Sequence, residues 1–134
     1  MKRYLLFLAI LVFTTCSGCF HTGDDGPTLF MVTGIVTVED EPLSQGVITF
    51  DPADGLAGSY GGEIRNGKYA FESAVGPKKV IIMASRPSKV PGPDGGPDME
   101  QYLPAKYNLK TELTANVVAG EKNEIPFQLQ IDQK

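Results

Sequence analysis

The stretch 60–71, YGGEIRNGKYAF, encodes a β-hairpin. Apolar or small residues occupy every second position on both sides of the central Asn66-Gly67 pair, as in strands that bury one face. Asn-Gly between two alternating runs is a strong hairpin signal, because a type I′ turn needs a positive φ at both central residues. The stretch therefore predicts two antiparallel strands joined by a tight turn.

The same period of two continues outward in both directions along the chain. It assigns Val32, Gly34, Val36 and Val38 to one inward face, and later Leu113, Ala115 and Val117 to another. In the last run, Ile125, Phe127, Leu129 and Ile131 share a face, while Pro126 cannot donate a ladder hydrogen bond and predicts an edge strand. Besides the hairpin, the predicted strands are Met31–Glu39, Gly46–Asp51 (burying Ile48 and Phe50), Lys78–Ser85, Thr111–Val118 and Asn123–Asp132.

About seven short strands are predicted, and no segment has the pattern of an amphipathic helix. Glu39-Asp40-Glu41-Pro42 predicts a turn, with Pro42 fixing its φ. The run Lys78–Ser85 is apolar on both faces at its centre, which predicts a central strand. Together these features favour an all-β fold, an antiparallel Greek-key β-sandwich of about seven strands.

One long segment, Arg86–Lys110, breaks the alternation. It holds five prolines and three glycines, a spacing that predicts no regular element, and loops of this length in compact domains are often functional. Its tyrosines Tyr102 and Tyr107 are candidate binding residues, able to stack on sugar rings or to contact a protein. The alternative is that Tyr107 and its neighbours fold back and close the open end of the sandwich.

The N-terminal stretch Met1–Cys19 has the pattern of a secretion signal. Two basic residues precede an apolar run, Tyr4–Phe13, that is shorter than the roughly 20 residues needed to span a bilayer. Ser17-Gly18-Cys19 resembles a lipobox, in which signal peptidase cuts before a lipidated cysteine. We therefore expect a signal peptide at residues 1–18, a lipidated tether at 19–28 and a β-sandwich domain at 29–132.

Three other interpretations of this stretch remain. Cys16 is a rival lipidation site, although Gly18 suits the position before cleavage better than Thr15. A simple secretory signal with two incidental cysteines is the second. The third, a redox Cys-x-x-Cys motif, lacks the βαβ context in which such motifs work.

Cleavage before Cys19 would leave 116 residues with a net charge of −6. An acidic chain without a basic cluster argues against nucleic-acid binding and against electrostatic binding to anionic lipid. Membrane attachment would then come from the acyl chains. The partners expected are the membrane, through this anchor, and an envelope protein or polysaccharide.

The sequence offers no catalytic motif. Its one histidine, His21, falls in the expected tether, and no cysteine follows Cys19, so we expect no enzyme, no cofactor, no metal and no disulfide in the mature domain. Asp94, Asp98 and Glu100 lie close together in the long segment, but their spacing is not that of an EF-hand and solvated acids are the favoured interpretation.

Three stretches resemble one group of proteins: residues 32–52 (VTGIVTVEDEPLSQGVITFDP), 66–73 (NGKYAFES) and 103–129 (LPAKYNLKTELTANVVAGEKNEIPFQL). They are similar to small lipoproteins of planctomycete-type bacteria, whose domain is similar to the transthyretin-like regulatory domain of carboxypeptidases. The resemblance covers most of Thr28–Asp132. It implies a transthyretin-like β-sandwich, a lipid anchor and a location at a membrane of the cell envelope, on its periplasmic or outer-surface face. It implies no activity.

Overall fold

The computed structural model describes residues 26–56 and 58–131, and these residues form an all-β fold. Within them the only helical element is the short 3₁₀ helix η1 (Ala105–Tyr107). The strands are β1 (Leu29–Val38), β2 (Glu41–Pro42), β3 (Gln45–Pro52), β4 (Tyr60–Arg65), β5 (Lys68–Ala74), β6 (Gly76–Met83), β7 (Ser85–Pro87), β8 (Met99–Gln101), β9 (Thr114–Val117), β10 (Asn123–Glu124) and β11 (Phe127–Leu129).

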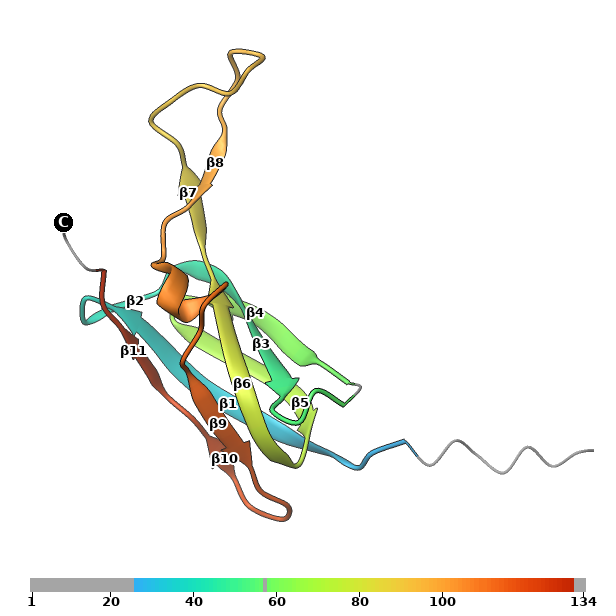
Figure 1. Cartoon of the computed structure of the whole chain (residues 1–134). Helices are drawn as coiled ribbons and strands as arrows, with labels where there is room; N and C mark the ends of the chain where they lie inside the picture. Colours follow the sequence, from blue (N-terminus) through green and yellow to red (C-terminus); the bar gives the residue numbers. More distant parts are fainter. Residues whose placement is uncertain (1–25, 57, 132–134) are drawn as a thin grey trace, which may run out of the picture.

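The body of the molecule is one strongly curled sheet (Figure 1). Its strand order is β10-β1-β5-β4-β3-β6-β9, and β2 and β11 also pair with β1. β6 has a neighbour on each side, as its sequence predicts. β4 and β5 share only the register pair Arg65↔Lys68 beside their turn. The two strands remain neighbours beyond that pair, since a Cβ on Gly62 would lie 3.4 Å from Cβ of Phe71, but the regular ladder is limited to the turn.

The hairpin at residues 60–71 is confirmed. Asn66 and Gly67 have φ values of 50° and 76°, both positive as a type I′ turn requires. The turn is held from outside as well, because Gly67 N–H donates to the Leu43 carbonyl at 2.7 Å and Gly67 C=O accepts from Val36 N–H at 2.7 Å. The local signal and the tertiary contacts therefore favour the same turn.

The first turn differs from the prediction at Pro42. Glu39 and Asp40 are its central residues, with φ values of 52° and 67°, and Glu41–Pro42 form β2, which pairs back on β1. Pro42 therefore lies in a short strand and does not set the turn. The Glu39 carboxylate accepts a hydrogen bond from Ile131 N–H at 2.6 Å, which ties the turn to the chain beyond β11.

Replacing Asp40 with glycine is expected to stabilise the protein. A non-glycine residue in the left-handed region carries a steric cost that glycine lacks. Removing this cost stabilises the folded state by more than the added chain entropy of glycine stabilises the unfolded state. We expect Asp40→Gly to raise the free energy of unfolding by about 0.5–1 kcal/mol, measured by urea titration. Glu41→Gly, one residue along in β2, is the control and should lower it.

The prediction of one continuous antiparallel strand at Asn123–Asp132 is wrong in both continuity and direction. The segment is divided into β10 and β11 around Pro126, and both parts run parallel to β1, with Val32↔Asn123 and Val36↔Phe127 in register. The other sheet pairs are antiparallel, as predicted. Pro126 does lie at a sheet edge, because among the described residues β10 and β11 pair only with β1.

The core contains the inward faces that alternation predicts. Phe50 lies at its centre and meets the Phe71 ring edge-on, with ring centroids 5.1 Å apart. Tyr69 reaches across β1 at Gly34, its partner in register, and donates its hydroxyl hydrogen bond to the Ile125 carbonyl at 2.6 Å. Burial raises the pKa of Tyr69 well above its usual range, so the phenol stays a donor. Other fully buried side chains are Val32, Val36, Ile48, Ile64, Val80, Ile82, Val117 and Leu129.

A buried lysine closes the end of the core near the start of β6. Lys78 is only 3% exposed and lies on the same face as Val80 and Ile82. Its ammonium group lies over the Tyr60 ring, 5.7 Å from the centroid. The aliphatic stem packs as an apolar side chain would, while the charge is stabilised by the face of the ring.

Candidate functional site

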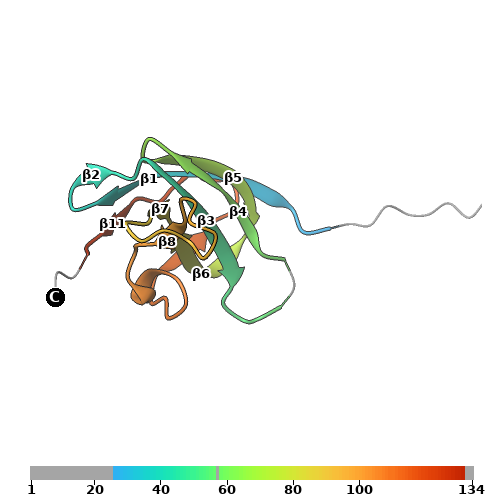
Figure 2. The ribbon, with the colours of Figure 1, turned by 90° about the horizontal axis from the view of Figure 1, so that it is seen from above.

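The most distinctive feature on the surface is an arm formed by residues 85–101. β7 and β8 pair antiparallel through Ser85↔Gln101, Arg86↔Glu100 and Pro87↔Met99 and form a separate two-stranded sheet. The arm rises from the end of β6 and projects away from the body (Figure 1), and it is seen end-on over the curled sheet in Figure 2.

The prediction that Arg86–Lys110 holds no regular element is therefore wrong. Pro87 ends β7 without interrupting its pairing, and Pro104 precedes η1. The remaining prolines lie in the tip, residues 88–98, where Ser88 N–H donates to Asp98 C=O at 2.8 Å and Gly92 N–H donates to Gly96 C=O at 2.9 Å. Proline at strand ends and turns removes no ladder hydrogen bond, which is why the segment retains a short ladder.

Tyr102 lies at the base of the arm and is half-buried against the core. The Arg86 guanidinium lies over its ring, 5.1 Å from the centroid, and Arg86 Nε also donates to Glu100 at 2.8 Å. One face of the Tyr102 ring is therefore already occupied by a cation. A sugar ring that stacked on this face would have to displace Arg86 from both the ring and Glu100.

Tyr107 lies in the body, away from the arm. It is 8% exposed, and its hydroxyl oxygen accepts a hydrogen bond from Gln130 N–H at 2.9 Å. Leu103 is buried beside it, and the Asn108 amide donates to the carbonyls of Leu103 and Pro104. This segment connects β8 to β9, and the hydrogen bond of Tyr107 ties it to the chain after β11, the arrangement expected of a plug. The structure thus separates the two tyrosines, and ligand binding at either stays a prediction.

The two tyrosines should respond differently to truncation. Tyr107→Ala removes a buried ring and the hydrogen bond to Gln130, so we expect it to lower the free energy of unfolding by about 3 kcal/mol. Tyr102→Ala removes a half-buried ring and should cost about 1 kcal/mol. Urea unfolding of both variants measures the difference, and equal losses would contradict the plug.

The acidic side chains of the arm make hydrogen bonds and an ion pair within the arm itself. Asp94 accepts from Gly96 N–H at 3.4 Å, Asp98 accepts from Met99 N–H at 2.8 Å, and Glu100 pairs with Arg86. Within residues 26–56 and 58–131, no three potential metal-ligating side chains come together. The carboxylates at this end of the molecule thus have structural roles in shaping the arm.

The arm exposes apolar side chains far from the core. Val90 in the tip is 70% exposed and Met99 on β8 is 56% exposed. β7 and β8 pair only with each other among the described strands, so each also leaves one edge unpaired. A small hairpin that projects without cover is marginally stable in water, and its free edges are templates for pairing with another chain.

Cys19, Cys16 and His21 lie outside the described residues, as do the signal peptide and most of the tether. In the part of the chain that the structure describes, no helix is long and apolar enough to cross a membrane. The anchor is therefore a prediction from the sequence.

No protein-family model and no curated protein matches the chain. Among solved structures, it is similar to a 9R-lipoxygenase from Cyanothece PCC8801, with a TM-score of 0.43 and 13% sequence identity. The match covers 77% of this chain and 16% of the lipoxygenase. A likeness of this degree carries no argument about chemistry.

Proposed function

We propose that the protein is a non-catalytic lipoprotein of the cell envelope that presents an interaction module at a membrane surface. In this proposal Cys19 carries the lipid, the domain is a β-sandwich of the carboxypeptidase-regulatory, transthyretin-like type, and the arm contacts an envelope protein. The observation that carries the proposal is the projecting arm, with its exposed apolar side chains and unpaired edges.

The position of the arm suits a tethered protein. β1 begins at the end of the body opposite to the arm (Figure 1). Cys19 precedes Leu29 by ten residues, which span at most about 35 Å when extended. A lipid at Cys19 would hold the start of β1 near the membrane, leaving the arm directed toward other envelope components.

The sandwich interpretation is supported by the register of the sheet. β3, β6 and β9 form one continuous antiparallel group, and the antiparallel pair β5 and β1 forms another group together with β10 and β11, which run parallel to β1. The groups are joined through β4, which keeps a full ladder with β3 but one pair with β5. Two layers facing each other across the Phe50 core are the arrangement that a β-sandwich requires.

A second function, peptide binding, is favoured by the free edges of β7 and β8. An extended peptide can add to such an edge through main-chain hydrogen bonds, with Met99 as an apolar contact beside it. Glycan binding through Tyr102 is less well supported, because Arg86 covers the ring.

Replacing the arm with a minimal turn tests the proposal. Ser85 and Gln101 are opposite each other in register, so residues 86–100 can be exchanged for Asn-Gly, which closes a two-residue hairpin. Gln101 keeps its hydrogen bond from Ala84 N–H. We expect the variant to stay folded, with a loss below about 1 kcal/mol, and to stop capturing its partner from envelope fractions.

The capture experiment compares the full chain and the arm variant as bait against envelope proteins and envelope polysaccharide, with quantitative mass spectrometry. Glu72→Gln, on the outer face of β5 far from the arm, is the control and should capture as the parent chain does. Equal recovery of the same protein by the arm variant would contradict the proposal. Retention on polysaccharide alone would replace it with glycan binding.

A further inference from the structure

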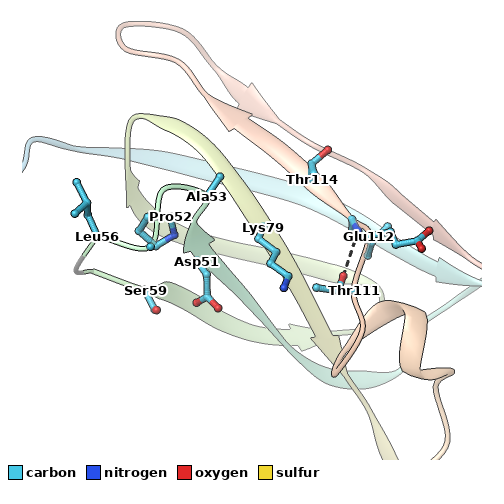
Figure 3. A pocket seen from close by; sticks show the side chains of 11 residues that line it. Asp51, Pro52, Ala53, Leu56, Ser59, Lys79, Thr111, Glu112 and Thr114 are labelled. Carbon is cyan, nitrogen blue, oxygen red and sulfur yellow. Dashed lines mark hydrogen bonds between the residues drawn. The ribbon is translucent and has the colours of Figure 1, made fainter.

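A second site lies at the other end of β6, independent of the arm. An open pocket of about 600 Å³ lies between the loop after β3 and the segment that precedes β9 (Figure 3). Lys79 on β6 and Asp51 on β3 form its floor, Ser59 borders it, and Pro52 and Leu56 line it on the β3 side. Lys79 is six residues from the start of the arm, about 20 Å along the strand.

Hydrogen bonds to the backbone of β6 hold a residue of each wall of the pocket. On the β3 side, Ala53 N–H donates to Pro77 C=O at 3.1 Å. On the other side, the buried Thr111 hydroxyl donates to Val80 C=O at 2.5 Å, and Val80 N–H donates to Leu113 C=O at 2.9 Å. Ala53 at the start of one wall and the segment from Thr111 to Leu113 in the other are therefore held in place against β6.

The floor presents two opposite charges, one from Asp51 and one from Lys79. Asp51 and Lys79 are partners in register on the outer face of the sheet, and their side chains extend to the same side (Figure 3). Among the described residues, neither charged group makes an ion pair or a hydrogen bond with another residue. The Glu112 carboxylate also lines the pocket but is directed away from Lys79.

From this geometry we propose that the pocket binds a free α-amino acid with an apolar side chain. The ligand carboxylate pairs with the Lys79 ammonium, and the ligand ammonium pairs with the Asp51 carboxylate. The Cβ atoms of directly opposite cross-strand residues stand about 5 Å apart, so both charged groups are within reach of one small zwitterion. The ligand side chain lies against Pro52 and Leu56 on the β3 side, and the Ser59 hydroxyl offers a further hydrogen bond.

Both charges of the ligand are necessary in this arrangement. A ligand with only a carboxylate would leave Asp51 unpaired beside a second negative charge, and an amine alone would leave Lys79 unpaired. A small zwitterion satisfies both groups without adding net charge. A ligand of this size in an open site is expected to bind with a dissociation constant of about 1 mM.

The test titrates the full chain in detergent with L-leucine and follows backbone amide chemical shifts. We expect saturable shifts at the floor of the pocket with a dissociation constant of about 1 mM. N-acetyl-L-leucine lacks the ammonium and L-leucinamide lacks the carboxylate, so each should bind at least about tenfold more weakly.

Variants of the two floor residues make the test specific. Lys79→Met and Asp51→Asn should each weaken L-leucine binding by about tenfold or more. Glu112→Gln is the matched control within the pocket lining, and Lys122→Met, whose ammonium pairs with Glu124 elsewhere, is the control for loss of a lysine. Both controls should bind as the parent chain does. Two results would overturn the proposal. One is the absence of saturable shifts at an L-leucine concentration 50-fold above the expected dissociation constant. The other is binding of both blocked derivatives as tightly as L-leucine itself.

Discussion

Gly34→Ala is expected to lower the free energy of unfolding by about 3–5 kcal/mol, a large share of the stability of a domain this size. A Cβ at this position would overlap the Ile125 carbonyl oxygen and would lie 2.7 Å from Cε1 of Tyr69. Both neighbours are constrained, since Ile125 belongs to the backbone between β10 and β11 and Tyr69 is fixed in the core.

The reason for this large effect is the contact that Gly34 permits. The Tyr69 ring crosses β1 over Gly34, and its hydroxyl donates a hydrogen bond to the Ile125 carbonyl. Ile125 N–H in turn donates to Thr33 C=O at 2.8 Å. One methyl group therefore strains the core and breaks a hydrogen bond that joins β5, β1 and the final strands.

Urea unfolding of the full chain measures this loss, with Gly26→Ala as the control. Gly26 undergoes the same chemical change, but a Cβ there would meet nothing within 4 Å. The control should change the free energy of unfolding by less than about 0.5 kcal/mol. A loss below about 1 kcal/mol for Gly34→Ala would show that β1 and the final strands are not packed as described.

Cys19→Ser is expected to abolish membrane attachment. A thioether-linked lipid cannot form on serine, and in the proposed lipoprotein the acyl chains supply the hydrophobic free energy that holds the protein at a bilayer. In cells fed labelled palmitate, the variant should incorporate no label, and it should leave the membrane fraction after carbonate washing.

Cys16→Ser is the matched control for this prediction. It makes the same substitution three residues earlier and should keep both the label and the membrane association. Labelling lost in Cys16→Ser and kept in Cys19→Ser would move the anchor to Cys16. Labelling kept in both single variants and in the double variant would contradict the lipoprotein proposal.

The inward faces of the strands were predictable from sequence because burial on a sheet has a period of two. Val32, Val36, Ile48, Phe50 and Leu129 are all buried as alternation requires. The turn at Asn66-Gly67 was predictable for an equally local reason, the positive φ that these residues tolerate.

Pairing direction was not predictable, because it depends on contacts between distant residues. The final strands lie beside β1 in parallel. Two hydrogen bonds fix this arrangement, one from the Tyr69 hydroxyl to the Ile125 carbonyl and one from Ile125 N–H to the Thr33 carbonyl. No local pattern near Pro126 carries that information. The count of prolines in Arg86–Lys110 was misleading for a related reason, since the position of proline within a ladder matters more than its frequency.

The candidate residues were only partly predictable. Tyr102 and Tyr107 are five residues apart in sequence, but one lies at the base of the arm and the other within the body. The pair Asp51 and Lys79 gave no signal in the sequence, because they become neighbours only through the register of β3 and β6. Knowledge of that register would have brought the two charges together.

The most direct test of the central claim places a photocrosslinking amino acid at the tip of the arm in living cells. Val90 in the tip and Val75, at the turn between β5 and β6, are both exposed valines, at 70% and 46%. We predict that the probe at position 90 crosslinks to one envelope protein and that the probe at position 75 does not. The same protein crosslinked from position 75 and not from position 90 would contradict the assignment of the arm as the contact surface.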